Sequence, residues 1–192
     1  MKKFLASALM LLAASTTTFA QNAVGSFSLQ PKAGISIADM TDTKGTTSRI
    51  GFVGGLEGEY QASDIFSLSL GVNYSQEGFK MKNSDNKIKL DYINVPILAN
   101  VYLTKGLAVK VGVQPGFNVG NSVTVDGNTM SSSKKDYDGI KSVALSIPVG
   151  LSYEISNVVL DARYNWGVTK AFDGLDSKNS VFQVTIGYKF QL

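Results

Sequence analysis

The last twelve residues of the chain, Val181 to Leu192, alternate between two kinds of side chain. Every second residue from Phe182 onward is apolar, and the residues between are polar or glycine. Side chains of a β-strand point to opposite faces with a period of two, so this stretch predicts a two-faced strand. It is longer than most strands of soluble proteins and long enough to cross a bilayer, which takes about 9–11 tilted residues. On its own, it fits a membrane barrel and a soluble barrel equally well.

Seven further segments before it show the same alternation of apolar and polar residues. They cover about residues 27–37, 50–60, 65–79, 88–103, 107–119, 143–153 and 158–168. Two of the segments are irregular. Pro31 cannot donate a ladder hydrogen bond, which predicts a bulge or an irregular start in the first segment. Apolar residues occupy both faces of the fourth, which predicts a bulge or a phase change near Asp91.

The connections between these segments alternate in length. Short connections lie near residues 61–64, 104–106 and 154–157. Long connections, rich in Gly, Ser, Asn, Asp and Lys, lie near residues 38–49, 80–87, 120–142 and 169–180. Short periplasmic turns and longer outer loops are typical of transmembrane barrels. We therefore predict an all-β fold, an eight-stranded antiparallel up-and-down transmembrane β-barrel of the small outer-membrane-protein type.

Alternation alone does not tell which face of such a barrel is wet. A soluble exterior carries many Lys, Arg, Asp and Glu side chains, whereas the polar faces here are mostly Gly, Ser, Asn, Gln and Thr with isolated charges. Small polar residues suit the inside of an eight-stranded barrel, where there is room only for side chains. The apolar face then meets lipid, and aromatic residues near the strand ends predict interfacial girdles. Aromatic packing inside a soluble barrel is the alternative.

The first twenty residues have the pattern of a secretory signal peptide. Lys2 and Lys3 form a basic start, residues 4–14 are an apolar run, and small residues precede a cleavage site after Ala20. We expect a signal peptide at 1–20 and one outer-membrane barrel domain at 21–192. Cleavage removes two of the 18 basic residues and leaves 16 against 15 acidic ones. This near-neutral balance, without a long basic run, argues against a nucleic-acid partner.

Two residue types that carry much protein chemistry are missing from the sequence. It has no Cys, hence no disulfide framework, and no His. His is the commonest general base and the commonest metal ligand. We therefore expect no enzyme activity, no metal site and no cofactor. The sequence also lacks a run of 18 apolar residues for a helical span, so a membrane protein with this sequence must be a closed barrel.

Five segments carry a resemblance to a known family: SFSLQPKAGIS, FSLSLGVNYSQEGFK, LDYINVPILANVYL, LAVKVGVQPGFNVG and VFQVTIGYKF. Together they resemble the PorT-like outer-membrane β-barrel proteins of Bacteroidetes, also called the porin family. The resemblance extends over essentially the whole mature chain. It implies an eight-stranded barrel in the cell outer membrane, and one member of the family is associated with a protein-secretion apparatus. It implies no catalytic or binding residues, because no defined site motif is matched.

The isolated charges on the polar faces are the candidate site. They are Lys32, Glu57, Glu59, Glu77, Lys110, Asp161 and Arg163. If they face the lumen, opposite charges must pair, because an unpaired buried charge is costly. We interpret them as a structural network of ion pairs that fills the barrel, with a narrow conduit for ions or water as the alternative. Glu57 and Glu59, two residues apart, also fit an acid–base pair or a cation site, but no third ligand is evident.

The sequence thus favours a non-enzymatic outer-membrane barrel with a filled polar lumen. It would act through its extracellular loops, above all residues 120–142, as a binding, structural or secretion-accessory protein. The expected partners are outer-membrane lipid and a secretion or envelope protein assembly. The alternatives are a porin-like pore for small solutes and a soluble periplasmic ligand-binding barrel.

Overall fold

The computed structural model describes residues 23–41, 46–82, 86–125, 128–132, 141–170 and 177–192. The strands are β1 (Phe27–Met40), β2 (Thr46–Ser63), β3 (Phe66–Met81), β4 (Lys87–Asn94), β5 (Ile97–Thr104), β6 (Leu107–Val125), β7 (Asn128–Ser132), β8 (Val143–Ile155), β9 (Val158–Lys170), β10 (Lys178–Tyr188) and β11 (Phe190–Gln191). The expected signal peptide lies outside the described residues, so it stays a prediction, as does the start of the mature domain. No helix formed by the described residues is long and apolar enough to cross a membrane.

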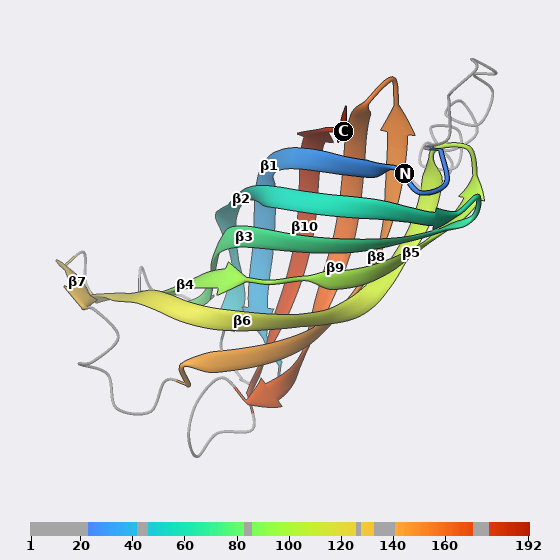
Figure 1. The fold of residues 1–192 in the computed structure, drawn as a ribbon. Helices are drawn as coiled ribbons and strands as arrows, with labels where there is room; N and C mark the ends of the chain where they lie inside the picture. Colours follow the sequence, from blue (N-terminus) through green and yellow to red (C-terminus); the bar gives the residue numbers. More distant parts are fainter. Residues whose placement is uncertain (1–22, 42–45, 83–85, 126–127, 133–140, 171–176) are drawn as a thin grey trace, which may run out of the picture.

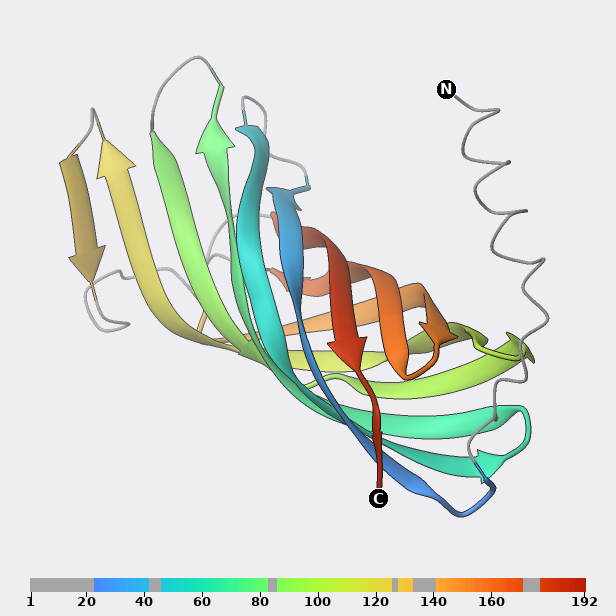
Figure 2. The same ribbon diagram turned by 90° about the horizontal axis from the view of Figure 1, so that it is seen from above.

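The strands close into one antiparallel ring (Figures 1 and 2). Neighbours along the chain pair from β1 to β3 and from β8 to β10, and β10 pairs back onto β1 over nine residue pairs. β4 and β5 both pair with β3 and β6 and so share one position of the ring. β11 extends β10 along β1. The ring therefore has eight positions, and the predicted eight-stranded up-and-down barrel is confirmed.

The barrel is apolar outside and polar inside. Along β10, Phe182, Val184 and Ile186 are exposed, whereas Gln183 and Thr185 between them are at most 5 % exposed. The other strands repeat this alternation, so a continuous apolar belt surrounds a polar lumen. A soluble barrel hides its apolar face inside, so that alternative is wrong.

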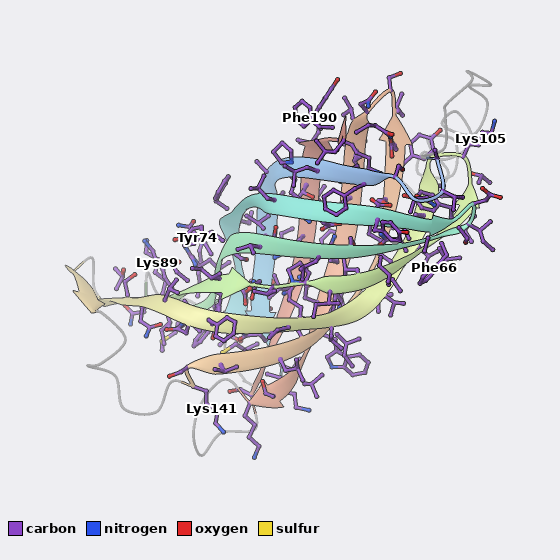
Figure 3. All side chains as sticks on the ribbon, viewed as in Figure 1. Phe66, Tyr74, Lys89, Lys105, Lys141 and Phe190 are labelled. Carbon is purple, nitrogen blue, oxygen red and sulfur yellow. The ribbon has the colours of Figure 1, made fainter. Side chains whose placement is uncertain are left out.

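Aromatic side chains stand at both ends of the apolar belt. Figure 3 shows Phe66 at the end of β3 that leads to a short turn, and Tyr74 about midway along β3, where its outward apolar residues end before the strand continues to Met81. Phe52 and Trp166 toward the loops, and Tyr60 and Phe190 toward the turns, are also exposed on the outside. This distribution matches the two aromatic girdles of membrane barrels.

The fourth position of the ring is irregular, as the mixed parity of its apolar residues predicted. The register between β4 and β6 shifts at Asp91 and Tyr92, which is a bulge at the predicted place. The strand is then interrupted between β4 and β5, at Val95 and Pro96. Leu90, Tyr92 and Leu98, which have the second parity, are at most 1 % exposed and fill the lumen.

The first strand is regular on one side and interrupted on the other. Pro31 pairs with Leu56 in an unbroken register between β1 and β2, so no bulge occurs there. On the other side of β1 the ladder stops at Lys32 and resumes at Leu29, so Gln30 and Pro31 are unpaired opposite the break between β10 and β11. The main-chain N–H of Lys189, in this break, donates instead to the carbonyl of Asn157 in the β8–β9 turn. The irregularity expected at the proline is thus an interrupted ladder, because Pro31 has no N–H to donate.

The strands extend beyond their predicted ends, mainly toward the long loops. β6 continues to Val125, and β7 pairs with it in a hairpin that projects from the barrel (Figure 1). Part of the predicted loop 120–142 is therefore strand, and residues 126–127 and 133–140 of it lie outside the described part. At the other end, Ser156 and Asn157 both have positive φ, 46° and 74°, as the tight two-residue turn of a hairpin requires. The alternation of short turns and long connections is thus present in the fold.

Replacing Ile186 with Arg tests the assigned lipid face. Ile186 is 55 % exposed in the apolar belt and pairs with Ala33 and Leu160. An arginine there should lower the free energy of unfolding in lipid vesicles by about 2–4 kcal/mol, because a charged side chain near the bilayer midplane is poorly solvated. The matched control is Val143→Arg, at the loop end of the same belt, which should cost about 0–1 kcal/mol. Equal costs at the two depths would contradict the assignment.

Candidate functional site in the barrel lumen

Glu57, on β2, is the centre of a group of charges in the middle of the lumen. Its Oε1 lies 2.9 Å from Nζ of Lys110 on β6, and its Oε2 lies 3.2 Å from Nη2 of Arg163 on β9. Lys32 on β1 forms a third ion pair with Oε2. All four residues are at most 7 % exposed. Their strands lie on different sides of the ring, so the side chains meet across the lumen and hold its walls together.

Asp161 completes this central cluster, which we define as Lys32, Glu57, Lys110, Asp161 and Arg163. The Oδ2 atom of Asp161 lies 2.9 Å from Nη2 of Arg163 and 3.2 Å from Nζ of Lys110. Gly150 of β8 pairs with Lys110 on one neighbouring strand and with Arg163 on the other. A position without a side chain between them leaves room for the two long cations to extend into the lumen. The cluster has three positive and two negative charges.

A second group lies nearer the short turns. Nζ of Lys189 is 3.1 Å from Oε2 of Glu59 and 2.7 Å from Oε2 of Glu154, and we call these three residues the short-turn cluster. Glu59 also accepts hydrogen bonds from Oγ of Ser67, at 2.6 Å, and from the hydroxyl of Tyr102. This cluster has one positive and two negative charges. Its net charge of −1 therefore balances the +1 of the central cluster.

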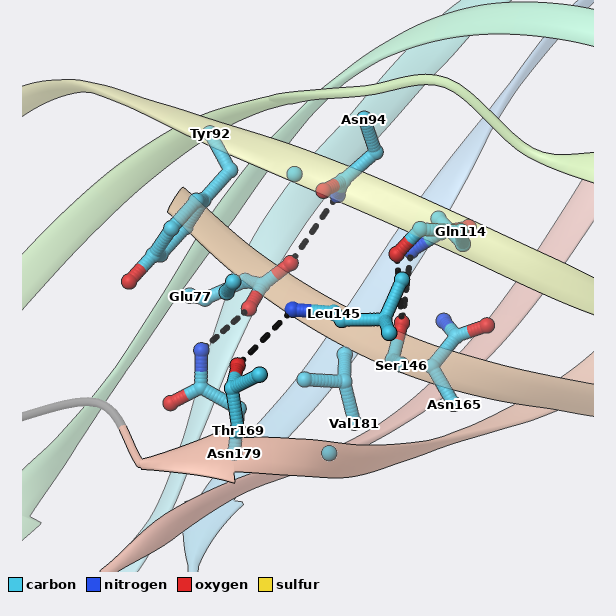
Figure 4. A pocket seen from close by; sticks show the side chains of 13 residues that line it. Glu77, Tyr92, Asn94, Gln114, Leu145, Ser146, Asn165, Thr169, Asn179 and Val181 are labelled. Atoms are coloured by element: carbon cyan, nitrogen blue, oxygen red, sulfur yellow. Dashed lines mark hydrogen bonds between the residues drawn. The ribbon is translucent and has the colours of Figure 1, made fainter. Parts of the chain in front are cut away.

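Glu77 lies apart from both clusters, toward the loop side of the lumen. Its carboxylate accepts hydrogen bonds from the amide groups of Asn94, at 3.1 Å, and Asn179, at 3.2 Å (Figure 4). Gly116 makes room for this arrangement, because a Cβ there would overlap the side-chain oxygen of Asn94. No Lys or Arg nitrogen of the described residues makes an ion pair with this carboxylate. Glu77 is 5 % exposed, so it is a buried acid without a basic partner.

The structure thus places all seven candidate residues inside the barrel but divides them. Five form the central cluster, Glu59 belongs to the short-turn cluster, and Glu77 stands alone. Sequence reasoning missed two members of the short-turn cluster. Lys189 already lay on the polar face of the last strand, so its parity was a usable signal, whereas Glu154 lay in an expected turn. Arg49, in an expected loop, is also buried and donates to the main-chain carbonyl of Glu77.

The carboxylates of the two clusters are engaged in ion pairs and are poorly placed for acid–base catalysis or metal binding. Glu57 and Glu59 point into the lumen two residues apart, but each carboxylate is already held by basic side chains. A group of three or more His, Cys, Asp and Glu side chains that could hold a metal ion does not occur in the described part of the chain. The charged side chains instead form ion pairs across the lumen, which is narrow in an eight-stranded barrel.

The sequence matches a family model described as outer membrane protein beta-barrel domain over residues 19–173. No curated protein matches it. The match covers more than half of the chain and includes both luminal clusters except Lys189.

Several solved structures resemble this fold, and two of them show the extent of the likeness. One is Ail, the attachment invasion locus protein of Yersinia pestis, in complex with the heparin analogue sucrose octasulfate. It shares 18 % identity with a TM-score of 0.55, and the alignment covers 88 % of this chain and 100 % of that one. The other is neisserial surface protein A (NspA), with 20 % identity, a TM-score of 0.57, and coverage of 85 % and 97 %. At these identities the likeness concerns the fold.

The charge balance of the central cluster predicts unequal effects of removing its members. Glu57→Gln leaves three buried cations facing Asp161 alone, and should lower the free energy of unfolding in lipid vesicles by about 3–5 kcal/mol. Lys32→Met removes one of the three cations and makes the cluster neutral, so it should cost clearly less. Urea titration of both variants checks this order. A larger loss for Lys32→Met than for Glu57→Gln would show that charge balance does not control the stability of the lumen.

Proposed function

We infer the function of this chain from its family: it belongs to the family of the outer membrane protein beta-barrel domain. It is an outer-membrane β-barrel, and its apolar belt lies in lipid. We propose that it is non-enzymatic, that its lumen is filled, and that it acts through its loop-side end as a binding protein. Membership in the narrower PorT-like group remains a prediction of the sequence.

The observation that carries the proposal of a filled lumen is the central cluster. Its salt bridges join β2 to β1, β6 and β9 and therefore span the middle of a narrow barrel. Above it, toward the loops, Met40 and Phe79 are buried with Ile88 packed against them. Solutes would have to displace both groups, and breaking buried ion pairs is costly. This favours a plugged barrel over a small-solute pore.

The β3–β4 hairpin supports binding at the loop side. Lys80 lies directly opposite Lys87, and Lys89 is on the same face. This face points outward, because Phe79 and Leu90, which have the other parity, are buried. Like charges directly opposite one another in a sheet repel, and none of the three makes an ion pair with a described residue. Figure 3 shows Lys89 near Tyr74 at this end of the barrel.

An anionic ligand would relieve this repulsion. We propose that the three lysines, the hairpin lysines, bind sulfate or phosphate groups of a cell-surface molecule. Charge-assisted hydrogen bonds to such groups are among the stronger polar contacts. The similar Ail structure holds sucrose octasulfate, a sulfated sugar, and this is the same class of ligand.

A second candidate function is assembly with another protein, as in a secretion or envelope complex. The observation that favours it is β7, which pairs with β6 and with no other described strand. Its second edge has main-chain donors and acceptors available for a further strand. The hairpin of β6 and β7 also extends beyond the other strands (Figure 2), where a partner could reach it.

Conductance distinguishes the filled lumen from a pore. In a planar bilayer, the wild-type protein should give no steady single-channel current, because the central cluster spans the lumen. A barrel with the same outer face but without the ion pairs of Glu57, Lys32→Ala with Glu57→Ala, should show intermittent current if it folds. Steady opening of the wild-type protein would contradict the filled-lumen proposal and favour the pore.

Loss of the hairpin lysines should weaken anion binding. Lys80→Gln with Lys87→Gln, in detergent, should bind sucrose octasulfate about tenfold more weakly than wild type, because two surface contacts of about 0.2–1 kcal/mol each are lost. Calorimetric titration measures the affinity. The control is Lys105→Gln, in the short turn at the other end of the barrel, which should leave the affinity unchanged. An equal loss in this control would point to nonspecific charge attraction.

A further inference from the structure

A small cavity lies inside the barrel beside Glu77. Its volume is about 20 Å³, which is room for one water molecule or one ion of similar size. Residues from β3, β4, β6, β8, β9 and β10 line it, so it is enclosed by most of the ring (Figure 4). It is separate from the central and short-turn clusters, because none of their members is among its lining residues.

Glu77 is the one inward acid of the described residues whose carboxylate has no Lys or Arg nitrogen within ion-pair distance; the buried Arg49 contacts its main-chain carbonyl instead. The other four, Glu57, Glu59, Asp161 and Glu154, each have a Lys or Arg nitrogen within ion-pair distance, and their clusters together are neutral. The side-chain donors to Glu77 are neutral: the amide groups of Asn94 and Asn179, and the hydroxyl of Ser75. A buried carboxylate in this situation must take up either a cation or a proton, because an isolated buried charge is very costly.

Three other side chains of the cavity have polar atoms without partners: the hydroxyl of Tyr92 and the amides of Asn165 and Gln114. Asn165 is 3 % exposed, and neither its Oδ1 nor its Nδ2 has a hydrogen-bond partner. Gln114 is also 3 % exposed, and its Oε1 has no partner, whereas its Nε2 donates to Ser146 at 3.4 Å. Buried polar groups are almost always hydrogen-bonded or bound to an ion. Glu77, Gln114 and Asn165 thus line the same small cavity, and the two amides have oxygens free to accept a ligand.

We propose that this cavity is a binding site for one small monovalent cation, with sodium as the fitting ion. Glu77 supplies the single negative charge, and the free oxygens of Gln114 and Asn165 supply neutral ligands. Oxygen ligands suit hard cations and not the metals that prefer sulfur or nitrogen. Calcium generally takes six to eight oxygen ligands, and magnesium demands an octahedral shell with several waters. One charge and one water-sized space fit a monovalent ion better than either.

The side chains around Glu77 are arranged for an ionised carboxylate. Both amide groups that contact it act as donors, each to a different oxygen of the carboxylate. A protonated carboxyl group would instead require an acceptor for its own proton. The site also needs no rearrangement of the central cluster, so cation binding and the filled lumen are independent features of the barrel.

The test compares the thermal stability of the wild-type protein, folded in detergent, in sodium chloride and in N-methyl-D-glucamine chloride of equal concentration. The bulky organic cation screens charges equally but cannot enter a 20 Å³ cavity. At a sodium concentration about ten times the Kd, mass action should raise the Tm by about 3–6 °C relative to the organic salt. Equal Tm values in the two salts would overturn the proposal, and this result does not depend on any variant folding.

Two variants then locate the site. Glu77→Gln removes the charge and keeps the shape, so the sodium-dependent shift should vanish. Gln114→Met removes one neutral oxygen at similar volume and should reduce the shift. The matched control is Asp64→Asn, an exposed acid in the β2–β3 turn, which should keep the full shift. A shift that persists unchanged in Glu77→Gln would place the effect elsewhere and overturn the proposal.

Infrared spectroscopy separates a cation from a proton. The spectra of the wild-type protein and of Glu77→Gln are compared in sodium chloride at neutral pH. If a cation neutralises Glu77, the two spectra should not differ in the carbonyl band of protonated carboxylic acids. Such a band in the wild-type spectrum alone would show that a proton neutralises Glu77, and the cavity would then hold water instead of a cation.

Discussion

The closed ring directs the polar side chains of the membrane-spanning part of the strands into a narrow lumen. An eight-stranded barrel has space only for side chains, and the belt outside must be apolar because it meets lipid. The charges inside must therefore neutralise one another. The central cluster and the short-turn cluster do this together, with opposite net charges. The same ion pairs hold β1, β2, β6 and β9 in place across the lumen.

This constraint also determines where the protein can act. A lumen crossed by ion pairs leaves the two ends of the barrel as the accessible polar surfaces. The turns at one end are two residues long, whereas the strands at the other end continue into hairpins and loops. The outward hairpin lysines and the free edge of β7 both lie at the loop side. Glu77, whose charge the two clusters leave unbalanced, also lies toward that side.

Period-two alternation predicted the eight-stranded ring, which side of each strand faces the lumen, and the positions of the short turns. It predicted the β4–β6 bulge as well, because apolar residues of both parities left no other regular solution. It was less accurate at strand ends, where β6 and β7 continue into the expected loop 120–142. At Pro31 the irregularity is an interrupted ladder to the last strand and not a bulge against β2. Main-chain pairing determines these details, and side-chain parity does not report it.

The sequence by itself determined that the charges lie inside, because their parity is opposite to that of the apolar belt. Only the tertiary structure decided which charges meet. Lys32 and Glu57 are 25 residues apart and Glu57 and Arg163 are 106 apart, and their contacts depend on how the ring closes and on the register of each strand pair. Parity places Glu57 and Glu77 on the same inward face. Ring geometry gives Glu57 three cations and Glu77 none, because distance across a lumen is a property of the closed barrel and not of any one strand.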